Sequence, residues 1–226
     1  MAANTLWCLG FPTQAVQRGQ DALALAQAAD YPVSLAFAQL WAVLLHYRRR
    51  EAPEVQTRTA ALLTLATEQE FPFFMGFGTF LGGWALAMQG HGEACLVQMH
   101  QGMATVLATG QELSQPFCLV LLAEAAGQAG QVTEGLRRLA DALTAFQASG
   151  RGDLLAEAYR LQGALLLRQA VADAAQAEAC FQQAIAIARR QQARSWELRA
   201  ATSLSRLWQH QGKRAAAYDL LAPVYG

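Results

Sequence analysis

Apolar residues recur along the chain in helical segments that begin about forty residues apart. The segments YPVSLAFA, FPFFMGFG and QPFCLVLLA begin at Tyr31, Phe71 and Gln115, which gives offsets of 40 and 44 residues. Each carries proline at its second residue. Proline is favoured in the first turn of a helix, where its missing N–H leaves no partner unsatisfied. The spacing therefore predicts a helical repeat of about forty residues.

A second marker of the repeat is glycine at the end of a helix. Four glycines lie 80, 40 and 82 residues apart, close to multiples of forty: Gly10, Gly90, Gly130 and Gly212. Small residues recur seven positions before them (Ala3, Gly83, Ala123, Ser205), five after (Ala15, Cys95, Gly135, Ala217) and twelve after (Ala22, Gly102, Ala142). Antiparallel helices approach closely only where both carry small side chains, so the pattern predicts stacked helix hairpins. In the second unit, which lacks this glycine, we place Arg49 at the turn.

This order of small residue, turn glycine and further small residues resembles the tetratricopeptide repeat (TPR) over nearly the whole chain. TPR units are about 34 residues long, whereas the units here are about 40, and the extra residues lengthen the second helix of each pair. The resemblance implies an all-α, right-handed superhelix of helix hairpins. In that fold the first helix of each pair lines the concave face.

A narrower resemblance is carried by LWCLGFPTQAVQRGQDALALA near the N-terminus and by the stretch from Ala177 to Gly226. Both resemble the C-terminal helical region of bacterial signalling proteins. Those proteins join an adenylate or guanylate cyclase domain and a STAND-type or AAA-type ATPase to TPR-like repeats. The resemblance implies a sensor, interaction or autoinhibitory arm rather than a catalyst.

The repeat predicts about five and a half helix hairpins in a single domain, residues 1–226. The expected helices span residues 2–9, 13–29, 32–48, 52–69, 73–89, 91–109, 115–129, 132–148, 153–170, 173–192, 195–210 and 213–224. The first unit is clipped, which raises the alternative that the chain is a fragment of a larger protein. Both ends of the superhelix would then expose helix faces that a neighbour normally covers.

Residues 71–90, FPFFMGFGTFLGGWALAMQG, raise the alternative of a membrane span. The stretch is long enough to cross a bilayer, and no charged residue occurs between Glu70 and Glu93. However, the forty-residue register continues on both sides of it. We therefore expect a helix of the superhelix, the most buried one in the chain, and no membrane association.

Composition favours a compact, non-catalytic protein. The chain has 54% hydrophobic residues, 15% charged residues and a formal net charge of zero, so nucleic acid is an unlikely partner on charge grounds. Four isolated cysteines fit reduced thiols in the cytoplasm. Gly212-Lys213 lacks the rest of a P-loop, and we expect no cofactor. His91 and Cys95 share a helix face, but two ligands do not make a zinc site.

Catalysis is not expected either, because His46, His91, His100 and His210 lie in four separate places rather than beside a nucleophile. Two arginine groups, residues 48–50 and residues 189, 190 and 194, close predicted helices. We interpret them as charges that complement the helix dipole, with a phosphate or nucleic-acid contact as the alternative.

The predicted function is therefore binding of a peptide, a partner domain or a small effector on the concave face. Aromatic residues cluster on early first helices and charged residues on later ones. For the aromatic residues, packing in the core between repeats is the favoured interpretation, and a hydrophobic groove is the alternative. The candidate binding residues are Phe37, Trp41, Phe73, Phe77, Phe80, Trp84, Glu124, Arg160, Arg199 and Arg206. Two other roles stay open: a scaffold that self-associates, for instance as a homodimer, and a DNA-associated regulatory arm.

Overall fold

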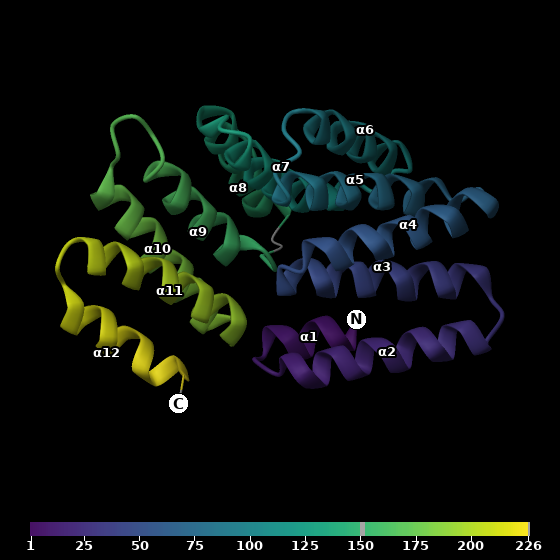
Figure 1. Cartoon of the computed structure of the whole chain (residues 1–226), viewed down its shortest axis with the longest axis horizontal. Helices are drawn as coiled ribbons and strands as arrows, with labels where there is room; N and C mark the ends of the chain where they lie inside the picture. The colour runs from purple at the N-terminus through teal and green to yellow at the C-terminus, as the bar shows by residue number, and fades with distance from the viewer. Residues whose placement is uncertain (150–151, 226) are drawn as a thin grey trace.

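The computed structural model describes residues 1–149 and 152–225, and the elements in them are all helical (Figure 1). The first helices of the pairs are α1 (Ala2–Cys8), α3 (Pro32–Arg49), α5 (Pro72–Met88), α7 (Gln115–Gln128), α9 (Leu155–Leu166) and α11 (Arg194–His210). The second helices are α2 (Pro12–Ala28), α4 (Ala52–Glu68), α6 (Ala94–Ala108), α8 (Val132–Ser149), α10 (Ala174–Arg190) and α12 (Arg214–Tyr225). A short 3-10 turn, η1 (Glu112–Ser114), precedes α7. The predicted all-α superhelix of helix hairpins is confirmed.

The forty-residue period is visible in the backbone of the turns. The four predicted glycines all adopt the left-handed conformation that lets a helix end and reverse, with φ of +93°, +85°, +82° and +79° at Gly10, Gly90, Gly130 and Gly212. After α3 the same place is taken by Arg50, with φ of 65°. The prediction of Arg49 at this turn is therefore wrong by one residue.

Small residues set the distance between paired helices, as predicted. A Cβ added at Gly102 of α6 would lie 2.5 Å from the backbone nitrogen of Phe80 and 2.7 Å from the carbonyl oxygen of Gly76, both in α5. A Cβ added at Gly83 would lie 2.7 Å from Met99 Cγ, and one at Gly135 would lie 2.9 Å from the carbonyl oxygen of Ala123. The helices of a pair thus pack backbone against backbone at these positions.

The apolar stretch in residues 71–90 forms α5, and no helix among the described residues is long and apolar enough to span a membrane. The expectation that it is the most buried helix is wrong. In α7, 11 of 14 residues are buried, against 11 of 17 in α5. α7 packs against α5, α8 and α9, whereas α5 leaves Pro72 exposed and Phe73 half-buried at its N-terminal end.

The first helices of the pairs form an inner layer that closes on itself. Each contacts the next, from α1 through α11, and α11 also contacts α1 (Figure 1). At this closure the Trp7 and Trp196 rings meet edge to face with centroids 4.8 Å apart, and Ser195 Oγ donates to the carbonyl oxygen of Trp7 at 2.5 Å. At the N-terminal end, α11 therefore covers part of α1, whereas α2 buries only Ala15 and leaves Leu25 71% exposed, as the prediction of an exposed helix face expects.

Gly102→Ala tests the close approach of α5 and α6. The added Cβ meets backbone atoms that cannot rotate away, so we expect a loss of about 1–3 kcal/mol in the free energy of unfolding. Gly19→Ala is the control, because its Cβ would meet side-chain carbons and no backbone atom, Leu45 Cδ2 at 3.3 Å and Ala3 Cβ at 3.9 Å. Urea unfolding followed by circular dichroism gives both values. An unchanged stability for Gly102→Ala would contradict the packing described here.

Candidate functional site

Two glutamates are buried where the inner helices meet, and one arginine joins them. Glu124 of α7 is 7% exposed and Glu157 of α9 is 1% exposed. Arg50 places Nη1 2.5 Å from Oε1 of Glu124 and Nη2 3.0 Å from Oε1 of Glu157. The residue that ends α3 in a left-handed turn therefore connects α3 to both α7 and α9.

Glu157 has two further arginine partners. Arg160 Nε lies 2.8 Å from Oε2 and Arg160 Nη2 lies 2.9 Å from Oε1, while Arg199 Nη1 is 3.5 Å from Oε1. Burial by itself raises the pKa of Glu157, but Arg160, Arg199 and Arg50 together outweigh it and lower that pKa to about 2. The carboxylate is therefore ionised at neutral pH. We call Arg50, Glu124, Glu157, Arg160 and Arg199 the ionic cluster.

Aromatic side chains surround the ionic cluster. Trp84 Nε1 donates to Glu124 Oε2 at 2.9 Å, and the Arg199 guanidinium lies 5.1 Å from the Trp7 ring and 4.9 Å from the Trp196 ring. Arg199 also donates to the carbonyl oxygen of Arg48. These contacts tie α11 to α1 and α3, so the ionic cluster extends to the closure of the inner layer.

Tyr47 of α3 is buried beside the ionic cluster, and its hydroxyl finds no hydrogen-bond partner among the described residues. Its ring centroid lies 4.9 Å from that of Trp84 and 6.0 Å from that of Phe117. Burial, reinforced by the charge of Glu124, raises the pKa of Tyr47, so the hydroxyl stays neutral.

A cavity of about 370 Å³ opens beside the ionic cluster, near the C-terminal ends of α3, α5, α7 and α9. We call it the arginine cavity. Its polar lining consists of Arg50, Glu124, Gln128, Arg160 and Arg168, and its apolar wall includes Trp84, Leu161, Ala164 and Leu165.

A second, smaller cavity of about 190 Å³ lies between the second half of α3, the N-terminal halves of α5 and α7, and the end of α8. We call it the aromatic pocket. Its wall is mainly apolar, formed by Trp41, Leu44, Phe77, Leu113, Pro116, Phe117 and Phe146. Arg48, Gln111, Ser114 and Asp153 complete its lining with polar groups.

The ten predicted binding residues lie at the ionic cluster, in the aromatic pocket, in the core or elsewhere on the inner helices. Trp84, Glu124, Arg160 and Arg199 are brought together at the ionic cluster, while Trp41 and Phe77 line the aromatic pocket. Phe80 is 0% exposed and fills the core, the place that the favoured interpretation of the aromatic residues gives it.

The remaining three of the ten lie outside both cavities and outside the ionic cluster. Phe37 is 47% exposed and packs edge to face on Phe74, while Phe73 is half-buried in the same cluster of rings. Arg206 is exposed on α11. Sequence analysis placed aromatic residues on the right helices without resolving which of their faces points to a cavity.

Arg50 is the functional residue that sequence analysis missed. The interpretation of residues 48–50 as charges on a helix dipole overlooks their contacts. Arg48 is buried and donates to Asn4 Oδ1 at 2.7 Å, and Arg49 binds Glu51 at 2.6 Å. The sequence does contain a signal for Arg50, which stands forty residues from both Gly10 and Gly90. At this repeat position the backbone has a positive φ, which strains glycine less than any other residue.

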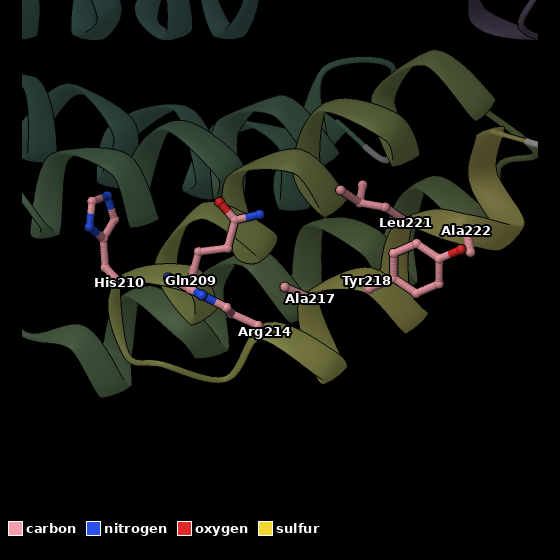
Figure 2. A pocket seen from close by; sticks show the side chains of 7 residues that line it. All are labelled: Gln209, His210, Arg214, Ala217, Tyr218, Leu221 and Ala222. Atoms are coloured by element: carbon pink, nitrogen blue, oxygen red, sulfur yellow. The ribbon is translucent and has the colours of Figure 1, made fainter.

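A groove of about 850 Å³ lies at the other end of the superhelix, between the end of α11 and α12 (Figure 2). It is lined by Gln209, His210, Arg214, Ala217, Tyr218, Leu221 and Ala222. Tyr218 is 73% exposed there. The expectation of an exposed helix face at the C-terminal end is therefore confirmed.

Among the described residues, the cysteine and histidine side chains are candidate metal ligands and nucleophiles. No three His, Cys, Asp or Glu side chains of the described residues form a possible metal site. All four cysteines are free thiols, and burial raises the pKa of Cys118 to about 12, which keeps that thiol protonated. His46 is engaged with Glu51, Nδ1 to Oε2 at 2.6 Å.

Comparisons with solved structures place the fold among TPR-like helical repeat proteins. Aspartyl phosphate phosphatase F from Bacillus subtilis superposes with a TM-score of 0.66 at 12% identity, over 99% of this chain and 57% of that protein's chain. A kinesin light chain-type protein with nearly identical TPR-like repeats, from Podosopora anserina, gives a TM-score of 0.55 at 17% identity, over 87% and 95% of the two chains. No protein-family model matches the sequence, and no curated protein matches it. The comparisons show a TPR-like superhelix, and the resemblance to cyclase and ATPase proteins stays a prediction.

Glu157→Gln tests the ionic cluster. The neutral amide leaves buried arginines short of a carboxylate, so we expect a loss of about 3–5 kcal/mol in the free energy of unfolding at pH 7. Glu54→Gln is the control, because Glu54 makes an i,i+4 pair at a half-exposed site, and its loss should stay below about 0.5 kcal/mol. Chemical unfolding measures both.

The same variant has a distinct pH profile. The folded-state pKa of Glu157, about 2, lies below its ordinary value of 4.5. The stabilisation is therefore present above pH 4.5 and is lost as the pH falls toward 2. Glu134, whose pKa is lowered to about 2 by hydrogen bonds from Arg137, titrates in both proteins. The difference in the free energy of unfolding between the original chain and Glu157→Gln should thus narrow as the pH falls from 4.5 toward 2. A difference that stays constant over this range would refute the lowered pKa of Glu157.

Arg50→Gly and Arg50→Ala separate the backbone role of Arg50 from its side-chain role. Both remove the ion pairs and should unfold more readily than the original chain. Alanine is strained at a positive φ and glycine is not, so Arg50→Gly should be the more stable of the two by about 1 kcal/mol. Equal stabilities would mean that position 50 is not left-handed in solution. Urea titrations of the original chain and both variants under the same conditions measure these free energies of unfolding.

Proposed function

We propose that this chain is a non-catalytic protein-interaction module that binds a segment of a partner protein through the aromatic pocket. The observation that carries the proposal is the pocket itself. Trp41, Phe77, Phe117 and Phe146 from four helices, α3, α5, α7 and α8, converge on a cavity of about 190 Å³.

The size and lining of the pocket match one apolar side chain of a partner. Large aromatic side chains give extensive contact with little loss of conformational freedom, and they are enriched among the residues that dominate binding energy. Phe77 and Phe117 are held by ring contacts, with centroids 6.1 Å apart, so the pocket needs little reorganisation. Arg48 and Asp153 can fix the direction of the partner backbone by hydrogen bonds.

The rim of the pocket supports access from outside. Leu113 on η1 is 61% exposed although it lines the pocket. An exposed apolar side chain beside an apolar cavity is a feature of interaction surfaces. Leu113 would therefore lose its solvent contact when a partner segment docks.

The wider context supports an interaction role. TPR-like architecture stacks helices into surfaces suited to protein partners, and the sequence resemblance would make the chain an arm of a bacterial signalling protein in the cytoplasm. Binding at the pocket would then be reported to an attached cyclase or ATPase. The expected alternatives, a self-associating scaffold, a small-effector sensor and a DNA-associated arm, stay predictions.

Trp41→Ala tests the proposal with peptides selected from a random display library on the intact protein. Removing a central aromatic contact costs roughly 2 kcal/mol, so we expect titration calorimetry to show a drop in affinity of about tenfold or more. Phe37→Ala is the matched control, an aromatic residue one turn earlier on α3 and outside the pocket lining. Its effect should stay within about twofold.

A second variant tests the proposal at a residue whose change should not affect folding. Leu113→Asp changes an exposed rim residue, leaves the core intact and should weaken the same peptides, because it places a charge beside the apolar pocket. Failure to select any peptide would overturn the proposal. So would selected peptides that bind the Trp41→Ala and Leu113→Asp proteins as tightly as the original chain.

A further inference from the structure

We propose that the arginine cavity binds an oxyanion, a carboxylate or phosphate group carried by a small molecule. The lining of this cavity has an excess of positive charge. Among the described residues that line it, Arg50, Arg160 and Arg168 face a single carboxylate, Glu124. The site is separate from the aromatic pocket, so the inference goes beyond the proposed function and does not depend on it.

The charge excess continues into the ionic cluster behind the cavity. Three guanidinium groups there share two carboxylates, and the side chains of Glu157, Arg160 and Arg199 are 1%, 14% and 20% exposed. Charges removed from water need partners, because solvation no longer offsets their cost. An anion in the adjoining cavity would balance the third guanidinium.

The arginines are held in place for such a ligand. Arg50 is fixed by Glu124 and Glu157, and Arg160 is fixed by two hydrogen bonds to Glu157. A guanidinium that is already oriented loses little freedom when it binds, and its planar fork matches the geometry of carboxylate and phosphate oxygens.

The spacing on α9 leaves room for the ligand. Arg160 and Ala164 lie four residues apart on one face of α9, and Arg168 lies in the turn just beyond the end of the helix; all three line the cavity. The small alanine between the two arginines leaves space that a larger side chain would fill. Trp84, Leu161 and Leu165 form an apolar wall beside the charges, which favours an anion that carries a short apolar portion.

The surrounding helices set the expected strength. Arg50, Met88 and Gln128 stand at the C-terminal ends of α3, α5 and α7 and line the cavity. Helix C-termini carry partial negative charge, which offsets part of the arginine excess. We therefore expect dissociation constants of about 1 mM rather than the micromolar range.

Titration calorimetry of the intact chain tests the inference, with inorganic phosphate and succinate as probes at constant ionic strength. Tighter binding of phosphate would assign the site to phosphate-bearing ligands, and tighter binding of succinate to carboxylates. Arg168→Gln should lower the affinity about tenfold, because a charge-assisted hydrogen bond contributes roughly 1.5–3 kcal/mol. Arg168 is exposed, so this change should leave the fold intact.

Two further variants make the result decisive. Ala164→Leu fills the space between the arginines without altering charge and should abolish binding. Arg206→Gln removes an exposed arginine of α11 outside the cavity lining and should change nothing. Absence of saturation with either anion up to about 50 mM would overturn the inference, as would binding that survives both Arg168→Gln and Ala164→Leu. Peptide binding at the aromatic pocket would be unaffected by either result.

Discussion

The Arg50 guanidinium holds together three helices that are far apart in the sequence. It ends α3 and reaches Glu124 of α7 and Glu157 of α9, the latter 107 residues away along the chain. Its backbone adopts a positive φ, a conformation that costs a non-glycine residue roughly 1 kcal/mol or more. At this position the positive φ places the side chain beside the two buried carboxylates.

The closed inner layer depends on this cluster. Arg199 of α11 shares Glu157 with Arg50 and also stacks on Trp7 of α1. Hence one carboxylate couples the first, second and last units of the superhelix. A TPR-like chain without such a link is stabilised mainly by contacts between neighbouring units. Here the ends are joined, so unfolding of one unit should disturb the units that are distant in sequence.

The sequence was sufficient for the fold because the fold rests on local, periodic constraints. Turn glycines, first-turn prolines and small residues such as Gly83 and Gly102 each act within one hairpin, and their positions repeat. The cavities rest on contacts between units. Whether Phe77 lines a pocket and Phe80 fills the core depends on the rotation of α5 against α3 and α7, which no pattern within α5 determines. Phe77 and Phe80 are three residues apart, less than one helical turn, so the two side chains lie on neighbouring parts of the same helix face.

The ionic cluster shows the same difference between what the sequence predicts and what depends on contacts between units. Glu124 and Arg160 could be selected from the sequence because charged residues on a mostly apolar first helix are unusual. Arg50 could not, because its role arises from a turn that points one side chain across the inner layer. An arginine in the place of a repeat glycine is strained at that position. Such a substitution persists when a long-range contact compensates for the strain, and in this chain the compensating partners are Glu124 and Glu157.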